Sequence, residues 1–319
     1  MLKTNIKSVA FGFVLICLII SVFVINQSFK SFARTYESGS SGDSLIFNKP
    51  YKLPENVTFA GEKMPLDNFD TRESLDREIL TSAYRHSSTI MIIKRANRYL
   101  PVIEKILKEN NIPDDFKYLV AAESEYSNVI SPSGATGFWQ IMASTGREEG
   151  MEINNVVDER YHLEKSTEFA CRYFQKSYEK YGNWTLAAAS YNGGRAAIDE
   201  QIRIQKENNY YDLLLAEETA RYIFRAVAYK MVISNPKNFG FEIDKNDLYP
   251  VLDYYEAKVD TAISDFSVFA KRYGTNYKIL KFLNPWLRKP YLTPKPYKEY
   301  LIKIPSEGMR TSEINETVN

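Results

Sequence analysis

The chain has 319 residues, 44% of them hydrophobic and 14% aromatic, which is enough for one substantial core and a small second domain. Its 41 basic and 40 acidic residues give a formal net charge of +1, so no overall positive field favours nucleic acid as a partner. The two histidines, His86 and His162, lack the spacing of a metal site, and we expect neither a metal nor a cofactor. Cys17 and Cys171 lie in unrelated contexts, so the cysteine count indicates no redox compartment.

The N-terminus carries an apolar run from Val9 to Ile25, preceded by Lys3 and Lys7. Its length of about 17 residues falls between a signal-peptide core and a membrane-spanning helix. Because positive charges before such a run stay in the cytoplasm, we expect the rest of the chain on the other side of the membrane. We predict a signal anchor or signal peptide over residues 1–30 and favour an uncleaved N-terminal membrane helix, with cleavage and export as the alternative.

Residues 31–71 are interrupted by residues that break regular structure. Ser and Gly fill residues 38–42, and Pro50, Pro54 and Pro65 follow. This composition predicts a flexible tether over residues 31–71.

Helical spacing of apolar residues begins at Arg72, with Asp70 or Thr71 as the predicted N-cap. A second helix is predicted over Ile90 to Asn110, divided or kinked at Pro101.

A third predicted helix is capped by Asp114 or Asp115 and ends at Glu123. Three more are expected at Leu163–Tyr181, from Trp184 to Gly194, and from Glu218 onward. Because no strand-like run interrupts this series, we predict an all-α domain over residues 72–245.

The pattern changes after Pro236. Alternating β-branched and aromatic residues predict a strand within Tyr249–Val259, and Phe266–Tyr273 is typical of a short helix. A turn at Asn284-Pro285 and a final strand at Tyr300–Pro305 complete a small α+β module over residues 246–308. Residues 309–319 are expected to be a frayed tail.

Glu123 closes an apolar helical stretch that contains Leu119 and Val120. An ionised carboxylate is costly to bury there, so its pKa should rise, as a general acid near neutral pH requires. Residues 137–142 then supply a flexible glycine, an aromatic plane and an amide that both donates and accepts. The arrangement favours a carbohydrate-cleaving site, and a solvated helix-end carboxylate near a core Trp139 is the alternative that these residues leave open.

Several blocks follow one another in a fixed order along residues 100–234. They are Glu123-Ser124, the run from Gly134 to Met142, Asp158-Glu159-Arg160, the run from Ser190 to Gly194, and the run from Glu218 to Tyr222. In these blocks the chain resembles the soluble-lytic-transglycosylase-like family, and most closely its membrane-bound D type. The segment from Phe266 to Pro305 is similar to a degenerate LysM module, a peptidoglycan-binding unit.

This resemblance implies a lysozyme-like helical catalytic domain that cleaves peptidoglycan between N-acetylmuramic acid and N-acetylglucosamine without water. Glu123 would be the sole general acid/base, protonating the glycosidic oxygen and then deprotonating the muramic C6 hydroxyl, which closes a 1,6-anhydro ring. A retaining glycosidase, by contrast, needs a second carboxylate about 5 Å away. The resemblance implies substrate-binding roles for Ser124, Ser131, Gly137, Gln140, Met142, Tyr191, Asn192, Glu218 and Tyr222.

The expected partners are peptidoglycan strands and, through the N-terminal helix, the membrane; we expect no nucleic acid. The expected location is the cell envelope, on the periplasmic side of the inner membrane.

Several of these roles have a structural alternative. Ser124 contacts the substrate acetamido group or only bonds within its helix. Gln140 binds sugar or orients the acid, or else is a buried structural amide. Tyr191 is expected to hydrogen-bond Glu123 and Asn192 the acetamido group, with a helix cap as the alternative for both.

Glu218 is expected to orient Glu123 or its substrate, or to be a first-turn helix carboxylate. We expect Asp158 to be structural, and Trp139 and Trp184 to lie in the core. Two rival functions follow: a lysozyme-type hydrolase that uses water with Asp158 or Glu218, and a catalytically silent tether between membrane and peptidoglycan. A chitin-active enzyme is a third.

Overall fold

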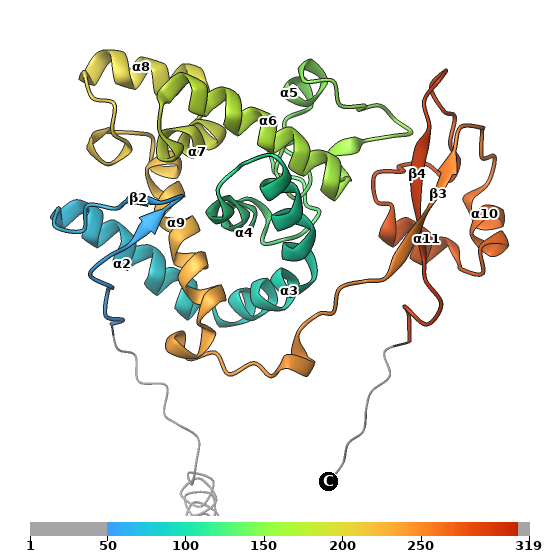
Figure 1. Ribbon diagram of the computed structural model, residues 1–319, viewed down its shortest axis with the longest axis horizontal. Helices are drawn as coiled ribbons and strands as arrows, with labels where there is room; N and C mark the ends of the chain where they lie inside the picture. The colour runs from blue at the N-terminus through green and yellow to red at the C-terminus, as the bar shows by residue number, and fades with distance from the viewer. Residues whose placement is uncertain (1–49, 312–319) are drawn as a thin grey trace, which may run out of the picture. The chain divides into compact units, whose positions relative to one another are not determined.

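A computed structural model describes residues 50–311 of the chain (Figure 1). The N-terminal segment predicted over residues 1–30, with its membrane helix, and the last residues of the predicted tail lie outside the described part. Within residues 50–311, no helix is both long and apolar enough to cross a membrane.

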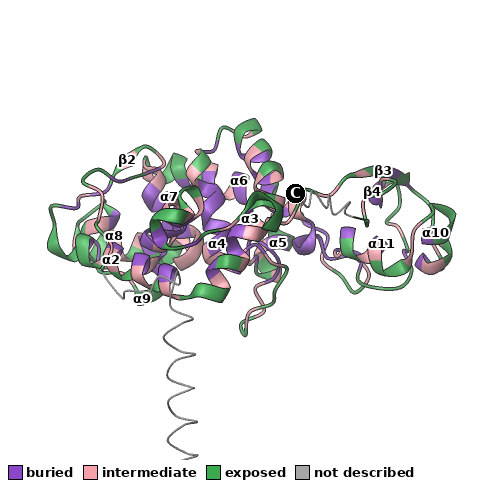
Figure 2. Ribbon diagram, turned by 90° about the horizontal axis from the view of Figure 1, so that it is seen from below, coloured by how far each residue is buried: buried purple, intermediate pink, exposed green. Residues whose placement is uncertain are grey.

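The larger part of the described chain is helical, as predicted. Its α-helices are α2 (Phe69–Tyr84), α3 (His86–Glu109), α4 (Leu119–Ser124), α5 (Ala143–Glu148), α6 (Leu163–Tyr181), α7 (Trp184–Gly193), α8 (Arg195–Gln205) and α9 (Glu217–Ser234). Figure 1 shows α4 near the centre of this domain with α9 beside it, and the two helices pack together. Figure 2 shows buried residues gathered among α4, α6 and α7, so the short α4 lies in the core.

The boundaries of α6 and α7 agree with the prediction because both ends carry clear signals. Gly182 ends α6 with a φ of 71°, a left-handed conformation that glycine adopts without strain. The Asn183 side chain then accepts a 2.7 Å hydrogen bond from the Leu186 N–H and caps α7.

Two predictions about helix starts and breaks are wrong. The helix expected from Arg72 begins at Phe69, so Asp70 and Thr71 lie in its first turn rather than at its N-cap. An acidic first-turn residue is favoured there by the helix dipole, which explains the misleading signal. The helix expected from Ile90 starts at His86, and α3 continues through the exposed Pro101, so the predicted division there is wrong and the alternative of a kink stays a prediction.

The predicted caps of the helix ending near Glu123 are also wrong. Asp114 and Asp115 instead begin a 3-10 helix, η1 (Asp114–Tyr118), that leads into α4. The Asp115 carboxylate accepts hydrogen bonds from the Ala60 N–H and from Lys230, both at 2.8 Å. It therefore ties Ala60 and α9 to the start of η1.

The predicted tether ends too late. From Tyr51 the chain packs on the helical domain, with a small hairpin of β1 (Thr58–Phe59) and β2 (Glu62–Lys63). Apolar side chains of this segment lie in the core, namely Val57, Phe59, Met64 and Leu66. The Glu62 carboxylate accepts the backbone N–H groups of Trp184 and Thr185 at 2.6 and 2.8 Å, so this segment also caps α7.

The C-terminal module is the predicted small α+β unit. It contains β3 (Tyr254–Val259), α10 (Phe266–Arg272), α11 (Tyr277–Leu283) and β4 (Tyr300–Pro305). β3 and β4 are antiparallel, with Tyr254 opposite Pro305 and Val259 opposite Tyr300. The strand expected over Tyr249–Val259 begins only at Tyr254, and α11 was not predicted.

The module contacts the helical domain through residues 152–164. The Asp158 N–H donates to the Trp286 carbonyl at 2.9 Å, and the Arg288 N–H donates to the Val156 carbonyl at 2.7 Å. Three acidic side chains of this segment pair with module lysines: Glu152 and Glu159 with Lys298, and Glu164 with Lys303.

Candidate active site

Glu123 lies in the last turn of α4, where the helix turns from core to surface. Leu119, Val120 and Ala121 are fully buried, whereas Ala122 and Glu123 are partly exposed. Glu125 ends the helix in a left-handed conformation with a φ of 52°. The carboxyl of Glu123 is therefore held at the edge of the core by a rigid helix.

The pKa of Glu123 is raised to about 7. Burial is the main cause, and the nearby charge of Glu218 raises the pKa further. The Tyr222 hydroxyl donates a 2.6 Å hydrogen bond to Oε1 of Glu123, and this bond and the charge of Arg225 partly offset the rise. Such a carboxyl can hold a proton near neutral pH and release it to a substrate, as general acid catalysis requires.

Ser124 fastens the following loop to α4. Its hydroxyl lies 2.8 Å from the carbonyl oxygen of Phe138 and 3.2 Å from that of Val120. Because this buried hydroxyl already has backbone partners, the contacts support the structural alternative over a bond to substrate.

Gly137 lies where the backbone of Arg160 passes very close to the loop. Its φ is 87°, and a Cβ at this position would lie 2.0 Å from the carbonyl oxygen of Arg160. Arg160 also donates from Nη1 to the Gly134 and Ile141 carbonyls, each at 3.2 Å, and Asp158 holds its guanidinium at 2.8 and 3.0 Å. Asp158 is thus structural, as predicted, and Gly137 allows the loop to pack on Arg160.

Gln140 and Met142 reach a groove of about 290 Å³ that Tyr191 and Asn192 line from the other side. Nε2 of Gln140 donates to the Gly137 and Val129 carbonyls at 2.8 and 3.1 Å, which fixes the side chain within the loop. Met142 is 42% exposed and so faces the groove rather than the core. The groove brings together residues from the loop and from the end of α7.

The hydroxyl of Tyr191 does not bind Glu123 as predicted. It donates to the Trp139 carbonyl at 2.7 Å, and Tyr222 makes the bond to Glu123 instead. Tyr191 still lies close to Glu123, since the carboxyl raises the pKa of its phenol together with burial, the larger cause.

Asn192 connects the groove to the start of α9. Its Oδ1 accepts a 2.9 Å hydrogen bond from the Thr219 hydroxyl, and its Nδ2 lies 3.5 Å from Oε1 of Glu218. Glu218 is exposed in the first turn of α9, so it is at once a first-turn carboxylate and a neighbour of Glu123.

Ser131 lies in a turn, and its hydroxyl bonds to residues of that turn rather than to the carboxyl of Glu123. Its hydroxyl accepts the Ala135 N–H at 3.0 Å and lies 2.9 Å from the Ser133 hydroxyl. Trp139 is fully buried and donates to the Thr167 hydroxyl, so it belongs to the core, as expected. Trp184 is only partly buried and stacks on Tyr178 with ring centroids 4.0 Å apart.

Arg225 was missed by the sequence reasoning. It follows Tyr222 by three residues on α9, and this spacing places both on one helix face. Spacing alone cannot show that the face meets α4, so no local signal connected Arg225 with Glu123.

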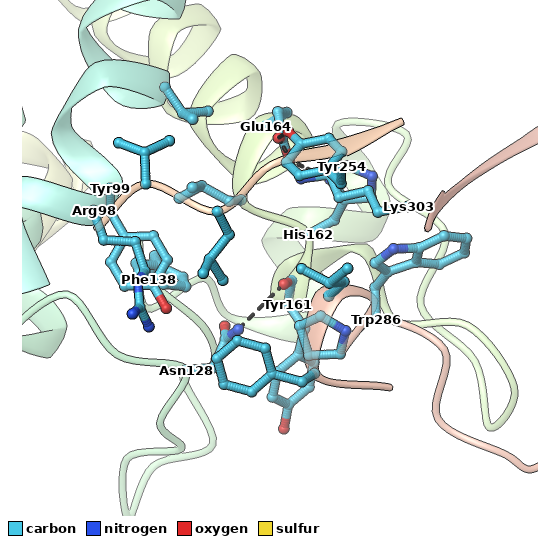
Figure 3. Close-up of a pocket in the computed structure, with 17 residues that line it drawn as sticks. Arg98, Tyr99, Asn128, Phe138, Tyr161, His162, Glu164, Tyr254, Trp286 and Lys303 are labelled. Carbon is cyan, nitrogen blue, oxygen red and sulfur yellow. Dashed lines mark hydrogen bonds and ion pairs between the residues drawn. The ribbon is translucent and has the colours of Figure 1, made fainter. Parts of the chain in front are cut away.

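A second pocket, of about 90 Å³, lies where the C-terminal module meets the helical domain (Figure 3). Figure 3 shows Glu164 beside Tyr254, His162 and Lys303. Burial alone would raise the pKa of Glu164, but His162 and Lys303 outweigh it and hold that pKa well below its usual value. Glu164 therefore stays ionised and is not a candidate general acid, in contrast to Glu123.

A bound metal ion would need a set of ligand side chains that lie close together. Within residues 50–311, no three His, Cys, Asp or Glu side chains lie together so as to hold a metal ion.

Comparison with known families agrees with this geometry. Residues 101–214 match the family described as the transglycosylase SLT domain. Residues 255–308 match the family described as the soluble lytic transglycosylase C-terminal LysM-like domain. The chain carries an SLT domain followed by a LysM-like domain. The SLT domain contains Glu123, the loop with Gly137 and Gln140, and the end of α7. The family resemblance inferred from the motifs is confirmed.

Two curated relatives extend the comparison. Over 234 residues the chain is 27% identical to the membrane-bound lytic murein transglycosylase D of Escherichia coli (strain K12), and equally to that of Escherichia coli O6:H1 (strain CFT073). Each comparison covers 67% of this chain and 51% of the relative, so the chain spans about half the length of these relatives.

Proposed function

We propose that this protein is a peptidoglycan lytic transglycosylase that cleaves the β-1,4 bond between N-acetylmuramic acid and N-acetylglucosamine. One observation carries the proposal: the SLT domain holds a partly buried carboxyl, Glu123, with a pKa raised to about 7 and a hydrogen bond from Tyr222. The relatives named lytic murein transglycosylase D support the same reaction.

In the proposed reaction, protonated Glu123 gives its proton to the glycosidic oxygen as the bond from C1 of the muramic sugar breaks. The resulting carboxylate then accepts the proton of the C6 hydroxyl on the same sugar, and that oxygen bonds to C1. A 1,6-anhydro end forms, no water is consumed, and Glu123 is protonated again. The Tyr222 hydrogen bond stabilises the carboxylate between the two steps and holds it in place.

The groove residues are proposed to hold the sugars beside this carboxyl. Gln140, Met142, Tyr191 and Asn192 line it, and Glu218 lies next to Asn192. Ser124, Ser131 and Gly137 contribute by shaping the loop. Attachment to the membrane by the N-terminal segment and a periplasmic location are part of the proposal. The relatives are named membrane-bound, which supports attachment to a membrane.

For the alternative function, a hydrolase that uses water, only one of the two carboxylates considered is available to activate the water. Asp158 is occupied by Arg160, so a second carboxylate for activating water would have to be Glu218, whose charge acts on Glu123.

The test is digestion of purified peptidoglycan sacculi by the wild-type chain and by Glu123→Gln, with products identified by mass spectrometry. We expect anhydro-muramic ends from the wild type and none from the variant. Products heavier by one water would identify a hydrolase. Turnover that is equally absent from both proteins would identify the silent tether, and cleavage of unmodified N-acetylglucosamine polymer would identify a chitin-active enzyme.

A further inference from the structure

A separate pocket of about 250 Å³ lies against the helix that carries Glu123. We call it the arginine pocket. Ala121 and Ala122, the two residues before Glu123, form one wall. The charged residues that line it are Glu78, Arg85, Glu125, Arg221 and Arg225. It shares no lining residue with the groove of Gln140 and Tyr191.

Glu78 is the acidic centre of this region and is only 1% exposed. Its carboxylate is 2.7 Å from Nε of Arg221 and 3.5 Å from Nε of Arg225. Arg77, outside the pocket, approaches the same carboxylate at 3.3 Å. Three guanidinium groups thus share one buried carboxylate, which balances the charge of only one of them.

The other acidic groups near the pocket do not neutralise this excess of positive charge. Glu125 pairs with Arg85 at 2.8 Å, and so balances that additional arginine. Glu217 lies 3.3 Å from Arg221 but is 81% exposed, so water screens its charge. The arginine pocket therefore keeps a net positive charge, and a further anion would offset the mutual repulsion of its guanidinium groups.

The arginines also retain free hydrogen-bond donors. Within residues 50–311, the recorded contacts use Nε of Arg225, Nε and Nη1 of Arg221, and Nη2 of Arg85. A guanidinium has five N–H donors in a planar fork that matches a carboxylate. Donors remain on all three groups for a bound carboxylate.

The arginine pocket adjoins the reacting carboxyl. Arg225 follows Tyr222 by one turn of α9, and its positive charge lowers the pKa of Glu123. Because Ala122 lines the pocket and directly precedes Glu123 on α4, a ligand in the pocket would lie next to the segment that carries Glu123.

We propose that the arginine pocket binds a carboxylate of the peptide stem that peptidoglycan carries on its muramic sugars. The inference rests on the proposed function, because only that substrate places an acidic peptide next to the cleaved bond. It predicts that the protein prefers glycan strands that still carry their stems.

The test uses one glycan in two forms: strands with stem peptides, and the same strands after an amidase has removed the peptides. We expect the wild-type KM to be about tenfold lower on the stem-bearing strands. Arg85→Gln should raise that KM by about fivefold, leave kcat unchanged, and leave both parameters on the stripped strands within about twofold of wild type. Arg85→Lys, which keeps the charge but not the planar fork, should recover part of the loss.

Arg77→Gln is the matched control, because Arg77 contacts Glu78 but does not line the arginine pocket. It should behave as wild type on both substrates. Equal wild-type KM values on the two substrates would overturn the inference, as would an Arg85→Gln variant that is impaired equally on both.

Binding of a free stem peptide, measured by calorimetry, separates this inference from the proposed function. We expect weaker binding to Arg85→Gln and Arg225→Gln than to wild type and Arg77→Gln. If the wild type produced no anhydro ends but bound the peptide through these arginines, the proposed reaction would fail and the peptide site would stand. Absent binding, or equal binding by all four proteins, would overturn the peptide site.

Discussion

Glu123 and Glu159 are two glutamates withdrawn from solvent, and they have opposite pKa shifts. Glu159 is only 5% exposed, yet its pKa is lowered to about 2. Burial alone would raise that pKa, but hydrogen bonds from Lys165 at 2.6 Å and Lys298 at 2.8 Å outweigh it. Glu123, by contrast, has a neutral phenol, Tyr222, as its hydrogen-bond partner, and its pKa rises to about 7.

The difference shows that burial supplies the tendency to keep a proton and that the partner decides the outcome. A lysine stabilises the ionised carboxylate and makes Glu159 part of the contact with the LysM-like domain. A neutral tyrosine orients Glu123 and offsets only part of the rise of its pKa to about 7. The same side chain is thus kept ionised at one place and has, at the other, the raised pKa that the proposed proton transfer requires.

The largest effect should come from removing each carboxyl in turn. Glu123→Gln should reduce cleavage of sacculi by about 10³-fold or more, because a general acid/base contributes about 10²–10⁴-fold and nothing replaces it. Glu159→Gln should keep the activity of its folded fraction within about tenfold of wild type. Release of anhydro ends, measured per folded molecule, distinguishes the two, and an active Glu123→Gln would end the comparison.

The raised pKa of Glu123 also predicts a stability difference with a definite sign. A carboxyl whose folded pKa is about 7, above its usual 4.5, stabilises the fold below about pH 4.5, and this contribution is lost as the pH rises through 7. Glu123→Gln has no charge to bury, so at pH 8 it should be more stable than wild type by about 2 kcal/mol. Urea unfolding at pH 8 and pH 5 measures this, and a gap that widens toward pH 5 would contradict it.

Tyr222→Phe tests whether the neutral partner tunes the acid. Its hydrogen bond favours ionised Glu123, so its loss should raise the pKa of Glu123 further. The alkaline limb of the pH profile of kcat/KM should move to higher pH, with a fall of about tenfold at the optimum. A loss of activity without movement of the limb would mean that Tyr222 only supports the fold.

The smallest effect is expected at the domain contact. Lys298→Met removes ion pairs with Glu152 and Glu159. It should lower the free energy of unfolding by about 1 kcal/mol at pH 7, since Lys165 still pairs with Glu159 and Lys295 still lies 3.8 Å from Glu152. A carboxyl whose pKa is lowered to about 2 gives stability above about pH 4.5 that is lost as the pH falls through 2, so the deficit should shrink toward pH 3.

Lys295→Met is the control for that measurement, because Lys295 is 56% exposed and lies 3.8 Å from Glu152. It should change stability by less than Lys298→Met. An Lys298→Met deficit that grows toward pH 3 would show that the lysine acts by packing rather than by charge.

The sequence by itself determined the helical class, the limits of α6 and α7, the small α+β module and the raised pKa of Glu123. These features depend on local signals: the left-handed Gly182, the Asn183 cap, and a carboxyl at the end of an apolar run. Each signal acts within one or two helical turns, so it can be recognised from a short stretch of sequence.

Only the tertiary structure decided which tyrosine bonds Glu123, that residues from Tyr51 onward belong to the core, and that Arg85, Arg221 and Arg225 surround one pocket. Tyr191 and Tyr222 are equally suitable in chemistry, and both lie on helices near the carboxyl. Their roles differ because the side chain of Tyr222 points from α9 at the end of α4, 99 residues earlier in the chain. Such choices depend on how helices pack, and no spacing within one segment records the direction of a side chain across that distance.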